Sequence, residues 1–218
     1  MLFGEPTKKG AGIILWGDYY DLNNVYETIS KLSDSLGPED SISDFVLGLC
    51  YEIRHAYQGD REIKKFGENE LSKVKYFGVK LLWPYIIIQV GLIRWAASYT
   101  TTNSEQQSNL YRLENIIETS LKEASISIAD ECLYWLKHFS GFSNDYLDQY
   151  LNEITYRYLF DETIEKKRIN RLPKVLKMTW ELSNEYKEFE SYLIKMAKEK
   201  GCRPKELRDI KEWPEFNW

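Results

Sequence analysis

Apolar residues recur three and four positions apart along most of the chain, the spacing that gathers them on one face of an α-helix. Glycine, proline and short polar clusters interrupt the pattern, as they do at helix ends. The pattern predicts successive helices within residues 21–37, 38–59, 83–99, 104–139, 146–158 and 173–201, and a short one from residue 204. Residues 104–139 are either one kinked helix or two that part near Ser125.

The segment from Trp83 to Tyr99 is apolar nearly all round, which is typical of a helix with neighbours on most sides. The longest apolar run, Leu81 to Ile93, contains Gln89 and is followed by Arg94. It falls short of the roughly 20 residues that a helix needs to cross a bilayer. We therefore expect residues 83–99 to be the buried central helix, and we expect no membrane partner.

Two segments have the signature of β-strands instead. Residues 12–16, GIILW, are a short apolar run between glycines, and residues 61–80 alternate loosely on both sides of FGENE. We expect a strand at 12–16 and a hairpin within 61–80 that pairs with it. The predicted fold class is mainly α, a multi-helix bundle around residues 83–99 with a small β element, and the alternative is an all-α bundle.

The composition predicts one domain over residues 1–218. Apolar residues make up 43% of the sequence, enough for a continuous core, and no Gly/Ser-rich, Pro-rich or charged linker divides the chain. The sequence closes with an aromatic tail, EWPEFNW. Its Trp213, Phe216 and Trp218 are not expected to stay free in water.

Charge and cysteine content narrow the classes of function. The net charge of −5 offers no overall attraction to nucleic acid or anionic lipid. Three widely spaced cysteines without a CxxC pair, and only two histidines, predict neither a metal site nor a cofactor. The N-terminal segment lacks the basic and apolar regions of a signal peptide, so we expect a reducing, cytoplasmic location.

One cluster of candidate catalytic residues stands out, in the segment YEIRHAYQG. Glu52 and His55 have the i, i+3 spacing that di-iron helical bundles use, but Trp135 occupies the position where His138 would need a matching glutamate. The alternative is a packing role: Gly48 on the same side suggests that another backbone approaches, which would leave His55 partly buried and hydrogen-bonded.

Arg54 and His55 also resemble the catalytic motif of HEPN-type ribonucleases, all-helical domains with a histidine four to six residues after an arginine. Positions 58–60 are Gln58, Gly59 and Asp60, so the histidine at that spacing is missing and His55 would have to replace it. The resemblance implies a degenerate HEPN-like, metal-independent ribonuclease or nucleic-acid-binding protein of a toxin–antitoxin or phage-defence system.

Two segments are candidates for binding a partner. One is the aromatic tail, because Trp and Arg commonly dominate binding energy. The other is a basic segment at the start of the helix predicted for 173–201, where cations in a first turn would oppose the helix dipole. Either an acidic partner, a phosphate backbone or the nearby residues Asp161, Glu162 and Glu165 could favour these cations. The basic segment consists of Lys166, Lys167, Arg168, Arg171, Lys174 and Lys177.

The wider pattern, GIILWGDYYDL followed by YEIRHAYQGDRE and a Trp-Pro helix start, resembles an uncharacterised bacterial family of about this length. The resemblance implies no activity. Enzymes usually show a convergent set of titratable groups, and only an isolated pair is visible. We therefore favour a noncatalytic interaction or regulatory protein of the bacterial cytoplasm, bound to another protein or to nucleic acid through 166–177. A homodimer and an enzyme assembled from distant residues both stay open.

Overall fold

A four-stranded antiparallel sheet is built from the first 82 residues of the computed structural model, which describes residues 1–36, 41–66, 73–138, 146–160, 168–207 and 213–218. The strand order is β1-β2-β4-β3. Strand β2, Gly12–Gly17, lies between β1, Phe3–Pro6, and β4, Val74–Leu82. Strand β3, Glu62–Phe66, pairs with β4 as a hairpin. The predicted strand and its pairing with a hairpin are confirmed, whereas β1 was not predicted.

The two faces of the sheet have different environments. Ile13, Leu15 and Val79 point to the face that packs against helices, and each is at most 2% exposed. On the other face, the Trp16 ring lies across Gly78, where a Cβ atom would come within 2.5 Å of the ring. The Lys64 ammonium lies 4.4 Å from the Trp16 ring centroid. Gly78 is therefore required by close packing.

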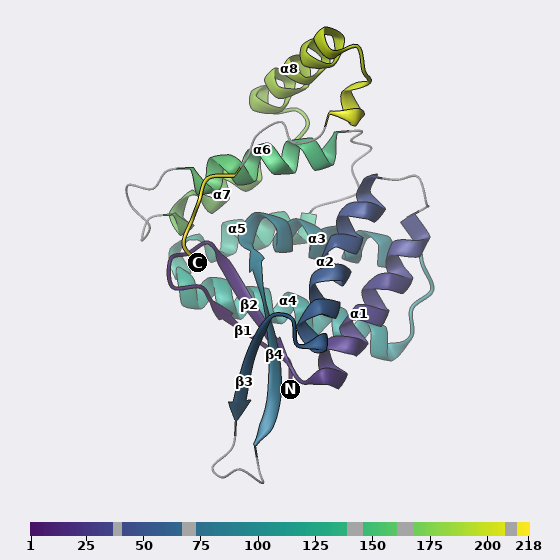
Figure 1. The fold of residues 1–218 in the computed structure, drawn as a ribbon, viewed down its shortest axis with the longest axis vertical. Coiled ribbons are helices and arrows are strands. Elements are labelled where there is room, and N and C mark those ends of the chain that lie inside the picture. Colours follow the sequence, from purple (N-terminus) through teal and green to yellow (C-terminus); the bar gives the residue numbers. More distant parts are fainter. Residues whose placement is uncertain (37–40, 67–72, 139–145, 161–167, 208–212) are drawn as a thin grey trace.

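Helices α1, Tyr19–Ser33, and α2, Ser41–Gln58, pack against each other beside the sheet (Figure 1). Asp18 caps α1 and forms a reciprocal capping box with Asp21. The capping position thus precedes the predicted start of this helix at residue 21. Gly59, with φ +90°, follows α2 in a left-handed conformation that favours glycine.

Helix α3, Trp83–Ala97, is the central element, as predicted. It packs against α1, α2 and the next four α-helices of the chain, and its Trp83, Ile87 and Ile88 are fully buried. No helix in the described ranges, α3 included, combines the length and the apolar character that crossing a membrane requires.

Residues 104–138 form two helices that part at Ser125: α4, Ser104–Ala124, and α5, Ile126–His138. Asn103 caps α4 and Gln106 completes the capping box. Helix α6, Leu147–Leu159, follows in the chain and contacts α3 and a short helix over residues 172–177. The Tyr158 hydroxyl on α6 donates a 2.5 Å hydrogen bond to the Gly10 carbonyl, which links α6 to the β1–β2 turn.

The single long helix predicted for residues 173–201 is wrong. A 3-10 turn, η3 (Ile169–Arg171), leads into the short α7, Leu172–Lys177, and a second helix, α8, runs over Asn184–Lys200. The helix breaks because the Ser183 hydroxyl accepts a hydrogen bond from the Tyr186 amide and starts a new helix. Gly201, in a left-handed conformation, ends α8 as predicted, and η4, Pro204–Glu206, follows.

The break in this region also changes the electrostatics of the basic segment. Lys174 and Lys177 lie in the last turn of α7, where a cation stabilises the helix dipole. The predicted conflict with a helix N-terminus is therefore wrong for Lys177, whereas Lys174, the third residue of this six-residue helix, lies in its first turn as well. The observed class is mainly α with a small antiparallel sheet, which excludes the all-α alternative.

Candidate functional site

The Glu52 and His55 side chains at the end of α2 are held by two residues of the turn that follows. The Glu52 carboxylate accepts two hydrogen bonds from the Arg61 guanidinium, at 3.0 Å and 3.2 Å. His55 Nδ1 lies 2.8 Å from an Asp60 carboxylate oxygen, and the His55 side chain is 23% exposed. These bonds close the turn between α2 and β3, and they confirm that His55 is partly buried and hydrogen-bonded.

Arg54 points elsewhere. Its guanidinium carbon lies 5.5 Å from the Tyr51 ring centroid, and its buried Nε makes no hydrogen bond with the described part of the chain. Neither Arg54 nor His55 is among the residues that line the two pockets described below. The structure therefore does not bring Arg54 and His55 together in either pocket.

Arg168 connects the two segments that were expected to bind a partner. It is 2% exposed, and its Nη1 donates hydrogen bonds to the carbonyls of Asn217 (3.0 Å) and Lys9 (3.5 Å). Of the other cations, Lys174 and Lys177 are exposed and Arg171 is half-buried, while Lys166 and Lys167 lie outside the described residues. Arg168 thus fixes the aromatic tail to the β1–β2 turn.

The aromatic side chains of the tail pack against the protein's own core. Phe216 and Trp218 are half-buried against it, with ring centroids 5.2 Å apart. Trp213 packs edge-on against Tyr85 of α3, with centroids 5.7 Å apart, and its indole N–H donates to the Asn152 side chain of α6. The tail is thus part of the fold and one wall of a cleft.

This cleft has a volume of about 460 Å³ and lies between α2, α3, the end of β4 and the tail. Ligand pockets in proteins commonly have volumes of about 300–1,000 Å³ and mostly apolar walls. The tail cleft, as we call it, is lined by Asp44, Phe45, Gly48, Leu49, Glu52, Lys80, Leu81, Leu82, Tyr85, Gln89, Trp213, Phe216 and Trp218.

Gly48 lies on the α2 side of the tail cleft, one turn after Asp44 and one turn before Glu52. A Cβ atom added at Gly48 would have a single described neighbour within 4 Å, the Gln89 side-chain nitrogen at 3.8 Å. The expectation that a second backbone approaches Gly48 is therefore wrong. What faces Gly48 is open space and the Gln89 amide.

Two polar groups of the tail cleft have unused hydrogen-bonding capacity. Gln89 is only 4% exposed, and its nitrogen donates a 2.9 Å bond to the Phe45 carbonyl while its oxygen has no partner among the described residues. Asp44 forms no ion pair with any described residue. By contrast, Lys80 is paired with Glu62 at 2.8 Å, and Glu52 is paired with Arg61.

The chain matches the family model "Domain of unknown function (DUF6904)" over residues 2–218. It belongs to this family. No curated protein and no solved structure matches the chain. The DUF6904 match confirms the resemblance to an uncharacterised family, and it assigns no activity.

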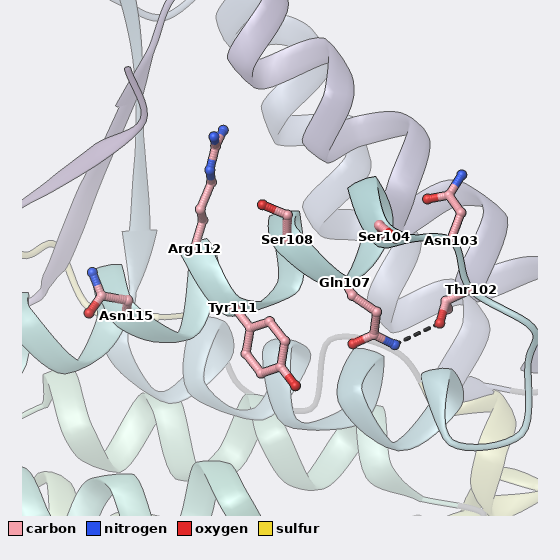
Figure 2. Close-up of a pocket in the computed structure, with 8 residues that line it drawn as sticks. All are labelled: Thr102, Asn103, Ser104, Gln107, Ser108, Tyr111, Arg112 and Asn115. Carbon is pink, nitrogen blue, oxygen red and sulfur yellow. Dashed lines mark hydrogen bonds between the residues drawn. The ribbon is translucent and has the colours of Figure 1, made fainter.

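A second hollow of this DUF6904 chain, about 680 Å³, lies along the start of α4. Figure 2 shows that its side chains diverge: Arg112 and Tyr111 point to opposite sides, and Gln107 donates a 2.6 Å hydrogen bond to the Thr102 hydroxyl. The polar groups that line it do not meet at one point. The hollow therefore lacks the convergent polar groups of a ligand site.

Metal and thiol chemistry receive no support from the described part of the DUF6904 chain. It contains no group of three or more His, Cys, Asp or Glu side chains that could hold a metal ion. Burial raises the pKa values of Cys50 and Cys132 to about 12, because a thiolate is poorly solvated in the core. Both are core thiols, as predicted.

The tail cleft was not predicted from the sequence, although two of its features are visible there. A glycine between two acidic residues at i−4 and i+4 places Asp44, Gly48 and Glu52 on one helix face. Gln89 interrupts an otherwise apolar helix. Nothing in the sequence indicated that these two features face each other.

Proposed function

We propose that this DUF6904 protein is a noncatalytic binding protein, with a regulatory role in the bacterial cytoplasm, that holds a small apolar ligand in the tail cleft. The observation that carries this proposal is Gly48. A glycine inside a helix costs about 1 kcal/mol of stability relative to alanine. At Gly48 no steric conflict requires that cost, and any larger side chain would extend into the space that a ligand would occupy.

The composition of the cleft favours binding over catalysis. Its lining contains no histidine, cysteine, serine or threonine, so it offers no pair of a nucleophile and a base. Two of its three charged side chains, Glu52 and Lys80, are engaged in ion pairs. What is left is an apolar, aromatic cavity with two polar groups, the usual make-up of a binding pocket.

Because the tail lines the cleft, ligand binding can regulate the surface that the protein presents to another protein. Trp213, Phe216 and Trp218 form one wall, and the Asn217 carbonyl between them is held by Arg168. A ligand that fills the cleft would contact the tail directly. Binding would therefore change how firmly the tail is held, and with it the surface that the protein presents to another protein through the exposed Lys174 and Lys177.

The test introduces a side chain at position 48 that occupies the cleft. Naphthalene, a neutral apolar probe, is titrated into wild-type protein and into Gly48→Leu, and binding is followed by saturation-transfer NMR. We expect binding to wild type and a loss of at least tenfold in affinity for Gly48→Leu, because the leucine side chain would occupy the probe's place.

The matched control is Ser191→Leu, which adds the same side chain to an exposed position of α8. It should bind naphthalene as the wild type does. Circular dichroism establishes that both variants are folded. Equal binding by folded Gly48→Leu and wild type, or no binding by wild type, would contradict the proposed function.

A further inference from the structure

Building on the ligand-binding function above, we propose that the tail cleft selects a small molecule with a protonated amine on an apolar body. The side chains that line the cleft provide an unpaired carboxylate, a buried hydrogen-bond acceptor and aromatic walls. Each of the three favours a cation that carries N–H donors.

The charge of the cleft comes from Asp44. Lys80 and Glu52 also line the cleft, but each is neutralised by its own partner, Glu62 at 2.8 Å and Arg61 at 3.0 Å. Asp44 has no such partner among the described residues, so its negative charge is the one left to attract a ligand. A cationic ligand would be attracted and an anionic one repelled.

The second contribution is the acceptor on Gln89. Its nitrogen donates to the Phe45 carbonyl at 2.9 Å, and its oxygen has no hydrogen-bond partner among the described residues. The Gln89 residue as a whole is 4% exposed. The Asp44 carboxylate and the Gln89 oxygen can both accept hydrogen bonds, and an ammonium group has three N–H donors and no acceptor, so one ammonium group can serve both.

The aromatic side chains provide the third contribution. Tyr85 and Trp213 meet at an interplanar angle of 73°, and Phe216 and Trp218 continue this wall along the tail. The faces of aromatic rings attract cations, most strongly for tryptophan. The same rings would accommodate the apolar body of the ligand, so one molecule can satisfy the wall and the acceptors together.

The test compares three probes that share a phenethyl group: phenethylammonium, the neutral phenethyl alcohol and the anionic hydrocinnamate. Isothermal titration calorimetry at neutral pH measures their affinities. We expect the ammonium to bind about tenfold more tightly than the alcohol, because charge-assisted hydrogen bonds are stronger than neutral ones. The carboxylate should bind most weakly.

Two aspartate variants locate the selectivity. Asp44→Asn should reduce the affinity for the ammonium about tenfold and leave that for the alcohol unchanged, since only the charge is removed. Asp130→Asn, which removes an exposed charge from α5 outside the cleft, should leave both affinities unchanged. In Gly48→Leu, binding of the ammonium should be lost.

The outcomes separate the two proposals. If naphthalene binds in a manner that depends on Gly48, but the three new probes bind equally or the Asp44→Asn variant keeps its preference for the ammonium, the amine selectivity is overturned and the binding function stands. Ammonium binding that survives Gly48→Leu also overturns it, because the site would then lie elsewhere. If neither naphthalene nor the amine binds, both proposals fail.

Discussion

The glycines of this protein differ in the reason for their presence. At Gly12 an added Cβ atom would lie 1.9 Å from the Leu81 carbonyl oxygen, and at Gly78 it would lie 2.5 Å from the Trp16 ring. These two positions have no room for a side chain. Gly48 has room, since its single close neighbour would be at the ordinary contact distance of 3.8 Å.

Gly48→Ala should therefore stabilise the protein. Alanine restricts the unfolded chain and favours the helix, which together should add about 0.5–1 kcal/mol to the free energy of unfolding. Urea denaturation of the two proteins, followed by circular dichroism, measures this difference.

Gly78→Ala is the opposing control for this measurement. It should destabilise the protein by about 1–3 kcal/mol, because the Trp16 ring would have to move. If Gly48→Ala were as destabilising as Gly78→Ala, something would pack closely against Gly48, and the main support for a ligand site would be lost.

At the scale of elements, the tail behaves as a structural segment. Removing residues 213–218 would expose the core beneath Phe216 and Trp218 and would leave the buried Arg168 without its Asn217 partner. We expect a loss of about 2–4 kcal/mol in the free energy of unfolding, from lost burial and from the lost hydrogen bond of the buried guanidinium. Urea denaturation of the truncated chain measures it.

The matched control for the truncation is Trp180→Ala. Trp180 is 47% exposed, so its loss removes a large aromatic side chain without uncovering the core. We expect a change below about 1 kcal/mol, as for most surface substitutions. A truncated chain as stable as the wild type would mean that the tail is held only loosely against the protein.

The sequence predicted helices and strands best where a single hydrophobic pattern determined them. The nearly all-apolar stretch around Ile87 identified the central helix, and the loose alternation on both sides of FGENE, residues 66–70, identified the hairpin. The prediction failed at residues 173–201, where the apolar stripe continues through the break between α7 and α8. There the capping hydroxyl of Ser183 prevailed over the periodicity.

The candidate site was harder to predict, because its walls come from four elements. The i, i+3 spacing of Glu52 and His55 made them candidate catalytic residues. Their hydrogen-bond partners, Asp60 and Arg61, are only a few residues away and form an ordinary turn. The cleft depends on Gly48 meeting Gln89 across two helices. Such an encounter is set by tertiary packing, which local patterns do not encode.

For the molecule as a whole, stability should decline in alkaline solution. Burial raises the pKa values of Cys50, Cys132 and Tyr150 to about 12, and raises that of Tyr158 further. In the unfolded chain these groups ionise at about 8.5 for a thiol and about 10 for a phenol. Below those values their contribution to stability is fully present, and it is lost as the pH rises toward the folded pKa values.

The urea midpoint should therefore be nearly constant between about pH 7 and pH 8 and fall progressively by about pH 11. Tyr158→Phe should reduce this decline, because the phenylalanine cannot ionise. At neutral pH the same variant should be less stable than the wild type by about 1–2 kcal/mol, since the Gly10 carbonyl loses its donor. A midpoint that does not change with pH would show that the buried groups ionise without cost.

The two bonds to the β1–β2 turn also affect the order in which this protein can assemble during synthesis. Gly10 receives its hydrogen bond from a residue 148 positions later, and Lys9 from one 159 positions later. A nascent chain leaving the ribosome exposes this turn long before either donor has been made. Until then, the carbonyls of this turn form hydrogen bonds with water. Contacts at such long sequence separation are typical of slow folding steps, which chaperones assist.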